Sequence, residues 1–175
     1  PLRLSKSNKF WNQTINFIPG GAQTFSKMPF QHGDGVAPKF IKKSKGCFSW
    51  DIDDNKYIDF MCSLGPIILG YCDKEVNKSA IQMIQQGSLI PSLPNTIETK
   101  LSKTLVSLIP SAEMVRFGKN GSDVTHAAVR AARGLTKKDI IAVCGYHGWH
   151  DWYIGTTSRD LGVPNKVKEL THKFF

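Results

Sequence analysis

The chain has 175 residues, of which 41% are hydrophobic and 21% charged, a composition typical of a folded globular protein and not of a disordered one. Its 23 basic and 14 acidic side chains leave a net charge of +9, but the lysines are spread along the chain, so we predict no nucleic-acid partner. No apolar run reaches the length of a membrane span and we recognise no leader segment, so we expect a cytoplasmic protein with no membrane partner.

The first predicted element is a helix at the N-terminal end. Trp11, Ile15 and Ile18 recur at helical spacing, and the Pro-Gly-Gly sequence at 19–21 ends the pattern. A hairpin is predicted over residues 48–60, because apolar and polar residues alternate over 48–52, and an Asp-Asp-Asn turn then leads into residues 57–60.

Two helices are predicted next, over residues 76–84 and 97–109. In each range the apolar residues fall on one helical face. Gly87 ends the first pattern and Pro110 stops the second.

Residues 114–144 carry the order strand, glycine turn, helix, strand. Residues 114–117 form a short apolar strand, and residues 124–135 place small residues on one flat helical face that is suited to packing on a sheet. Residues 140–144 are continuously apolar, which is typical of a strand buried on both faces. This order predicts a βαβ unit in a parallel sheet.

Two loops, 118–123 and 145–151, follow the carboxyl ends of these strands, where parallel sheets bind ligands. The first loop leads into a helix N-terminus, whose free N–H groups favour an anion. Gly118 and Gly121 allow close backbone approach, and the Ser122 hydroxyl can donate a hydrogen bond. The same residues could simply turn the chain and cap the helix, and these two interpretations stay open.

The order of residues excludes two nucleotide motifs. A P-loop needs a lysine directly after its second glycine, whereas Lys119 precedes Gly121, and no GxGxxG fingerprint is present. Tyr146 offers a flat aromatic face for stacking. Alternatively, Tyr146, Trp149 and Trp152 only pack beneath a long loop.

Metal and disulfide chemistry are not indicated. His147, His150 and Asp151 could bind a metal, but no third histidine is near, so we predict no metal site. The four cysteines show no paired spacing, and we expect them to be buried, reduced thiols.

Three segments together carry a family resemblance: "VRFGKNGSD" at 115–123, "AAVRAARG" at 127–134 and "GYHGWHDW" at 145–152. With them the chain resembles the class III (ω-type) aminotransferases that depend on pyridoxal 5'-phosphate (PLP). The resemblance is closest to the branch of glutamate-1-semialdehyde aminomutase and the aminotransferases of polysaccharide biosynthesis.

The resemblance implies an α/β fold, the PLP-dependent transferase fold type I of aspartate aminotransferase, present here in part. Residues 1–62 would form an N-terminal segment with a helix and a small antiparallel hairpin. Residues 63–175 would form the first part of the large PLP-binding domain, which is mostly a parallel sheet and is truncated here.

The resemblance also implies a cofactor site. Gly121 and Ser122 would hold the PLP phosphate, with Asn120 beside them. Tyr146 would stack on the pyridine ring, and His147 completes that motif.

Substrate residues are implied in two other segments, which include Lys27 and Ser63. The aminomutase carries an arginine where Lys27 stands, and lysine cannot offer the same planar two-point contact to a carboxylate. This disfavours glutamate-1-semialdehyde as the substrate. The segments "FGKNGSD" and "CGYHGWHDWYIG" are more similar to aminotransferases of this branch that act on keto-sugars, so we expect a keto-sugar.

The resemblance places the Schiff-base lysine beyond Phe175, so no catalytic residue is expected in this chain, which would be an N-terminal fragment, poorly folded and inactive alone. We expect a PLP-dependent aminotransferase, homodimeric at full length, that transfers an amino group from an amino donor to a keto or aldehyde substrate. The alternatives are glutamate-1-semialdehyde 2,1-aminomutase and a catalytically incomplete anion-binding or PLP-binding remnant.

Overall fold

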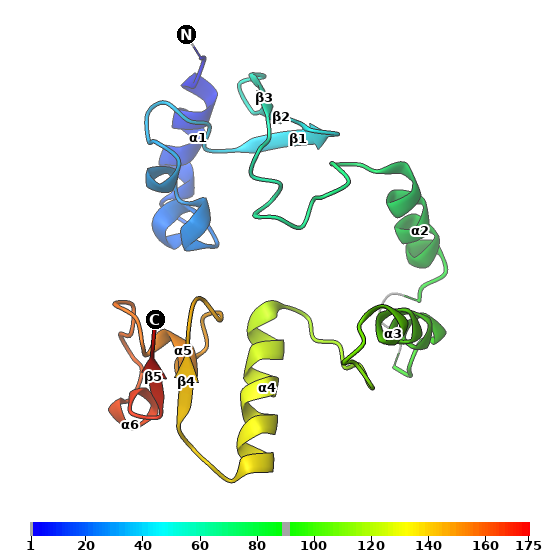
Figure 1. Cartoon of the computed structure of the whole chain (residues 1–175). Coiled ribbons are helices and arrows are strands. Elements are labelled where there is room, and N and C mark those ends of the chain that lie inside the picture. The colour runs from blue at the N-terminus through cyan, green and yellow to red at the C-terminus, as the bar shows by residue number, and fades with distance from the viewer. Residues whose placement is uncertain (1, 89–91) are drawn as a thin grey trace. The chain divides into compact units, whose positions relative to one another are not determined.

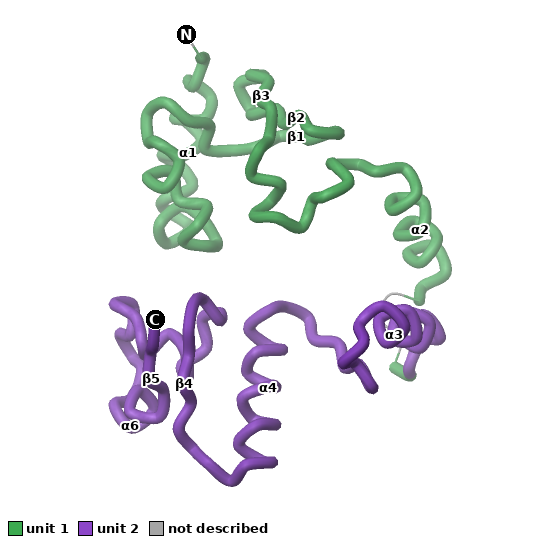
Figure 2. The backbone as a smooth tube through the Cα atoms, in the orientation of Figure 1, with its two compact units in different colours: residues 1–93 green, residues 94–175 purple. Residues whose placement is uncertain are grey.

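A computed structural model describes residues 2–88 and 92–175 of the chain (Figure 1). The chain divides into two compact units, residues 1–93 and 94–175 (Figure 2). These units reflect contacts within this chain and do not test the domain boundary between residues 62 and 63, which stays a prediction. Each unit is described by itself.

The first unit begins with the predicted N-terminal helix. Helix α1 (Ser5–Thr14) is followed by three short 3-10 turns: η1 (Pro19–Gly21), η2 (Phe25–Lys27) and η3 (Pro29–Gln31). The helix is therefore confirmed, although it ends one turn early, so that Ile15 and Ile18 lie beyond it. At Gly21, a Cβ atom would lie 2.1 Å from the Trp11 ring, so the Pro-Gly-Gly turn packs directly on the helix.

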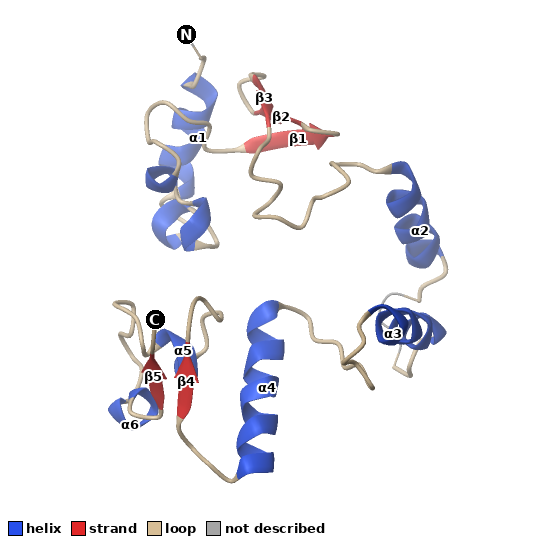
Figure 3. Ribbon diagram, in the orientation of Figure 1, coloured by secondary structure: helices blue, strands red, loops and turns tan. Residues whose placement is uncertain are grey.

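A three-stranded antiparallel sheet follows (Figure 3). It has the order β1 (Ile41–Lys45), β2 (Phe48–Asp51) and β3 (Lys56–Ile58). The predicted hairpin is confirmed by β2 and β3. Strand β1 was not predicted, because its sequence Ile-Lys-Lys-Ser-Lys lacks the apolar alternation of a half-buried strand.

Asp51 is the fully buried centre of the hairpin turn. Its Oδ1 accepts the backbone N–H groups of Asp53 (2.9 Å) and Asn55 (2.8 Å). Its Oδ2 accepts the Asn55 side-chain amide (2.7 Å) and the Tyr57 hydroxyl (2.8 Å). Four donors thus compensate a buried carboxylate, which would otherwise be costly.

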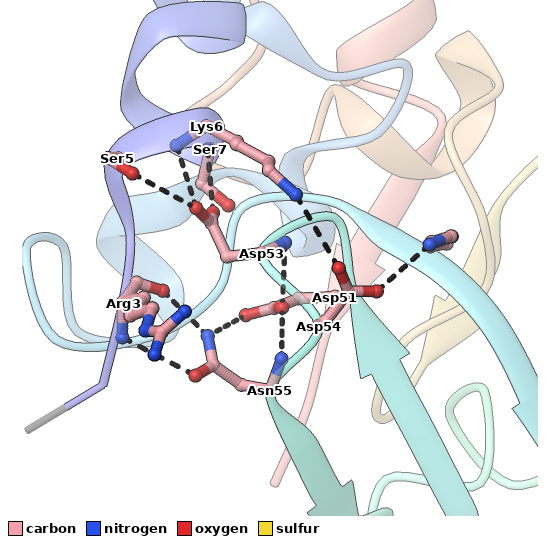
Figure 4. Close-up of polar contacts among 9 residues, drawn as sticks. Arg3, Ser5, Lys6, Ser7, Asp51, Asp53, Asp54 and Asn55 are labelled. Atoms are coloured by element: carbon pink, nitrogen blue, oxygen red, sulfur yellow. Dashed lines mark hydrogen bonds and ion pairs between the residues drawn. The ribbon is translucent and has the colours of Figure 1, made fainter.

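Asp53 joins this turn to the start of α1 (Figure 4). Its two carboxylate oxygens accept the backbone N–H groups of Lys6 and Ser7, each at 2.7 Å. Burial by itself would raise the pKa of Asp53, but the Ser7 and Lys6 hydrogen bonds outweigh burial and hold the pKa below its usual value. A residue distant in sequence therefore caps a helix that has no cap of its own.

Helices α2 (Lys74–Gln85) and α3 (Thr96–Leu108) confirm the two predicted helices. The Asp73 side chain caps α2, and Asn95 with Glu98 forms a capping box at the start of α3. By contact, α3 belongs to the second unit.

After α3, the second unit continues with five elements along the chain. They are helix α4 (Gly121–Thr136), strand β4 (Ile141–Val143), the short helices α5 (Asp151–Ile154) and α6 (Asn165–Lys168), and strand β5 (Thr171–Lys173). Strands β4 and β5 pair in parallel, with Ile141 opposite Thr171, so the predicted parallel sheet and helix α4 are confirmed. The small core consists of Val143, Trp152 and Tyr153, packed against Val129 and Ile141.

Three details of the predicted βαβ unit are wrong. Residues 114–117 form no strand, and within the described residues β4 pairs with β5 alone. The run at 140–144 is not buried on both faces, since Ile140 is 61% exposed. The small-residue face of α4 does not pack on the sheet, because α4 reaches the core through Val129 and leaves Leu135 86% exposed. These features all need neighbouring elements that the described residues do not supply.

Among residues 2–88 and 92–175, no helix is both long enough and apolar enough to cross a membrane.

Candidate functional site

The second unit contains a pocket of about 430 Å³ between the start of α4 and the loop after β4. Its walls come from eight residues: Asn120, Gly121, Ser122, Thr125, Tyr146, His147, Gly148 and Trp149. All five residues predicted to contact the cofactor are among them. The two loops that follow residues 114–117 and β4 therefore face the same space.

The N-terminus of α4 leaves two backbone donors at this pocket. The Asn120 side chain caps the helix by accepting the N–H of Asp123 at 3.1 Å. In the described part of the chain, the N–H groups of Gly121 and Ser122 have no acceptor. These donors lie at the positive end of a helix of 16 residues, so this end of the pocket suits an anion.

Ser122 adds a hydroxyl to these donors. The residue is only 8% exposed, and its Oγ accepts the backbone N–H of Trp149 at 3.3 Å. Because this bond uses an oxygen lone pair, the hydroxyl proton stays available for donation. The serine can therefore join the backbone N–H groups in binding an anion.

Thr125 ties the helix to the loop. Its Oγ1 lies 2.9 Å from the carbonyl oxygen of His147 and 3.1 Å from that of Ser122. Sequence reasoning missed this residue. A usable signal existed, because Thr125 follows Ser122 by three positions and so lies on the same helical face.

Two glycines shape the walls of the pocket. A Cβ atom at Gly148 would lie 2.3 Å from the Ser122 Oγ, and the backbone φ of +103° also disfavours any side chain there. A Cβ atom at Gly121 would meet nothing within 4 Å. The loop thus approaches the helix closely at Gly148, while space remains open at Gly121 for a ligand.

Of the Tyr and Trp residues in this loop and α5, Tyr146 and Trp149 line the pocket. They are 78% and 69% exposed, whereas Trp152 is 7% exposed. The packing interpretation thus holds for Trp152 alone. The Tyr146 ring makes a T-shaped contact with Tyr153, with 5.7 Å between the ring centroids.

The histidines form contacts within the protein. The His147 ring pairs its Nε2 with the carbonyl oxygen of Cys144 at 2.7 Å, and His150 Nε2 lies 4.0 Å from Asp123 Oδ1. Over residues 2–88 and 92–175, no group of three or more His, Cys, Asp or Glu could hold a metal ion.

The cysteines are free thiols, but the expectation that they are buried is wrong. Cys62 is half-buried, and Cys47, Cys72 and Cys144 are exposed.

The two predicted substrate residues lie in the first unit. Lys27 is exposed at the end of η2. Ser63 is exposed in a turn between β3 and α2 and has a positive φ of 56°. Their assignment to the substrate stays a prediction.

Comparison with known proteins identifies a family and relatives. The family model "Aminotransferase class-III" matches residues 30–175. The chain is 38% identical to the 3-aminobutyryl-CoA aminotransferase of Cloacimonas acidaminovorans, over 99% of the chain and 41% of that protein. It is 35% identical to the glutamate-1-semialdehyde 2,1-aminomutase of Syntrophobacter fumaroxidans, over 93% of the chain and 38% of that protein. The chain thus spans about two fifths of the length of these relatives.

Solved structures agree. The FumI protein of Sphingopyxis sp. MTA144, determined in its PLP internal aldimine form, matches with a TM-score of 0.85 and 27% identity, over 97% of this chain and 40% of that one. An ω-transaminase from Sphaerobacter thermophilus matches with a TM-score of 0.83 and 22% identity, over 96% and 41%. The second match, at this identity, concerns the fold alone.

Proposed function

Because the chain belongs to the class-III aminotransferase family and has part of the PLP-dependent transferase fold type I, we propose that its pocket binds PLP in an enzyme that transfers amino groups. The amino group would move from an amino donor to a keto or aldehyde substrate. PLP is the cofactor that the family indicates. When bound, it supplies the electron sink needed to exchange an amino group for a carbonyl oxygen.

One observation carries the proposal at the level of this chain. The unpaired N–H groups of Gly121 and Ser122 and the Ser122 hydroxyl share one pocket with the exposed ring of Tyr146. A phosphate with an aromatic ring attached would use both groups at once. We propose that the helix N-terminus binds the phosphate and that Tyr146 stacks on the pyridine ring.

Asn120 and His147 would act by holding the pocket in shape. Asn120 caps α4 and so keeps the free N–H groups aligned. His147 bonds the carbonyl oxygen of Cys144 through its ring and receives the Thr125 hydroxyl on its own carbonyl oxygen. These contacts fix the loop that carries Tyr146.

The substrate is proposed only as a class, an amino donor with a keto or aldehyde acceptor. The relatives reported above are named for a coenzyme A thioester and for glutamate-1-semialdehyde, so the keto-sugar stays a prediction without support from these names. The aminomutase is the second candidate, favoured by the 35% identical relative. The presence of Lys27 in place of arginine disfavours the aminomutase. A catalytically incomplete remnant is the third.

The remaining proposals concern the whole protein. We propose a homodimer in the cytoplasm whose Schiff-base lysine lies outside this chain. We also propose that residues 63–175 open the large PLP-binding domain, after an N-terminal segment of residues 1–62.

The test uses the complete natural polypeptide that contains this chain. We expect bound PLP to give visible absorbance, and a panel of amino donors to yield their keto products when a keto acceptor is present. An aminomutase would instead convert a single substrate into its isomer without releasing a keto product. Absence of both reactions in a protein that binds PLP would favour the remnant.

Ser122→Ala tests the phosphate contact. Loss of a hydrogen bond to a charged group should weaken PLP binding by about tenfold to a hundredfold. Ser107→Ala is a matched control, because Ser107 lies exposed on α3 and its hydroxyl bonds only its own helix. Equal PLP affinity in the two variants would contradict the assignment of Ser122.

A further inference from the structure

A left-handed turn lies between β3 and α2. Its residues Cys62, Ser63 and Leu64 have φ values of 46°, 56° and 68°. Left-handed backbone is uncommon for any residue other than glycine, and three such residues in succession are strained. Strain of this kind persists only where the surrounding structure imposes it, and it is concentrated at functional sites.

Burial does not impose this conformation. Ser63 is exposed, Leu64 is 61% exposed, and the neighbouring Phe60 is 88% exposed. Packing in this unit therefore contributes little to the turn. Its conformation must depend on hydrogen bonds.

Asp59 makes the bonds that open the turn. Its Oδ1 accepts the backbone N–H groups of Met61 (2.8 Å) and Cys62 (3.1 Å). The turn then closes on itself, because the N–H of Leu64 bonds the Met61 carbonyl at 2.7 Å and that of Gly65 bonds the Cys62 carbonyl at 3.0 Å. One carboxylate oxygen thus directs the chain into the left-handed region.

The other carboxylate oxygen is anchored to the sheet. Asp59 Oδ2 accepts the Tyr71 hydroxyl at 2.7 Å and the Ser49 hydroxyl at 3.3 Å. Ser49 lies on β2, and Tyr71 pairs its backbone with Gly46 through two bonds of 2.8 and 2.9 Å. The hydrogen bond from the Tyr71 hydroxyl is the largest effect on the pKa of Asp59, and together with the other hydrogen bonds it outweighs burial, which acts in the opposite direction. The pKa of Asp59 is therefore held below its usual value, so the anchor is a charged one.

Tyr71 and the turn share the same carboxylate. The Asp59 carboxylate, with burial second, raises the pKa of the Tyr71 hydroxyl. The other oxygen of this carboxylate accepts the backbone N–H of Cys62, the residue before Ser63. A movement of Asp59 would therefore displace the backbone that carries Ser63.

We propose that Asp59 is a positioning residue, which holds the turn Cys62–Leu64 in its left-handed form so that Ser63 faces the substrate. This inference rests on the proposed function and on the prediction that Ser63 belongs to the substrate side of the site. Asp59 acts through the turn and does not itself touch the reacting atoms.

The test replaces Asp59 in the complete PLP-loaded protein. Asp59→Asn keeps the size of the side chain and one oxygen, but it removes the charge and an acceptor. We expect the KM of the keto substrate to rise about tenfold, while kcat changes little, because the lost contact positions substrate before chemistry. PLP absorbance should stay unchanged. Tyr71→Phe, which leaves the carboxylate in place, should shift KM in the same direction by less.

A glycine rescue separates positioning from general stability. Leu64→Gly in the Asp59→Asn background should restore KM, because glycine adopts a positive φ without strain. Leu69→Gly, a glycine outside the turn, is the matched control and should not restore KM. Hydrogen exchange at the amides of residues 64 and 65 should become faster in Asp59→Asn. It should slow again when Leu64→Gly is added, but not when Leu69→Gly is added.

Three results would overturn the inference: an unchanged KM in Asp59→Asn, a raised KM that Leu64→Gly fails to restore, or unchanged amide exchange in the turn. Failure of the proposed function would give a different result from these three. In that case the wild-type protein would bind PLP but transfer no amino group, which would remove the substrate role of the turn. The amide exchange rates would still show whether Asp59 holds the turn.

Discussion

The loop residue Gly148 lies so close to Ser122 that a Cβ atom on the glycine would be 2.3 Å from the serine Oγ and 3.0 Å from its Cβ. The contact joins the N-terminus of α4 to the loop after β4, the two walls of the candidate PLP pocket. A side chain added at Gly148 must therefore displace Ser122 or the loop.

Gly148→Ala should displace the loop or the Ser122 hydroxyl. Overpacking of this kind costs about 1–3 kcal/mol, and the positive φ adds strain, so we expect PLP affinity to fall by about tenfold or more. Gly134→Ala is the control, since a Cβ atom there meets nothing within 4 Å and α4 should tolerate or gain from it. The measurement is PLP titration followed by visible absorbance. A Gly148→Ala protein with wild-type affinity would show that the pocket does not need the close approach.

Thr125→Val keeps the size of the side chain but removes the hydroxyl that contacts the His147 and Ser122 carbonyl oxygens. A lost hydrogen bond costs about 1 kcal/mol, so PLP should dissociate several times faster through a looser loop. Thr104→Val on α3 is the control, because the Thr104 hydroxyl contacts only the Lys100 carbonyl of its own helix. Equal dissociation rates in the two variants would assign Thr125 no part in holding the loop.

The candidate pocket was largely predictable because its signals are local. A helix N-terminus after a glycine turn, with Asn120 and Ser122 beside it, can be recognised within a few residues. The strand predicted at 114–117 failed for the opposite reason. A strand forms only when a second strand pairs with it, and the local sequence does not identify the second strand. In the described chain β4 pairs with β5 instead.

The link between Asp53 and α1 was also beyond local reasoning. Asp53 caps a helix 46 positions earlier in the chain, and "DIDDN" resembles any acidic hairpin turn. Likewise, the backbone strain at Cys62 and Ser63 cannot be predicted from the sequence, because neither residue type prefers a positive φ. Such features depend on the tertiary structure.

The Tyr57 hydroxyl should ionise at a higher pH than an ordinary tyrosine hydroxyl. Burial, followed by its hydrogen bond to Asp51, raises the pKa of Tyr57 to about 12, above an ordinary value of 10.0. The pKa of Tyr57 is higher in the folded than in the unfolded chain. The contact therefore stabilises the fold fully at pH values below the pKa of the unfolded chain. The stabilisation is lost as the pH rises from about 10 towards 12, because only the unfolded chain ionises there.

Difference absorbance titration of wild type and Tyr57→Phe measures this in the complete protein. The difference curve should have its midpoint near the raised pKa, and the variant should lose less stability than wild type over the same alkaline range. A midpoint near the ordinary value would contradict the hydrogen bond between Tyr57 and Asp51.

The isolated polypeptide 1–175 should fold poorly and transfer no amino groups. Many large apolar side chains are strongly exposed in it, among them Met114 at 92%, Leu135 at 86% and Leu161 at 97%. A buried core of four hydrophobic residues among those described cannot offset the ordering of two separate units. We expect aggregation, or a broad non-cooperative transition in denaturant, with PLP binding weaker than in the complete protein. A soluble monomer that unfolds cooperatively would show instead that these two units hold their structure without the rest of the fold.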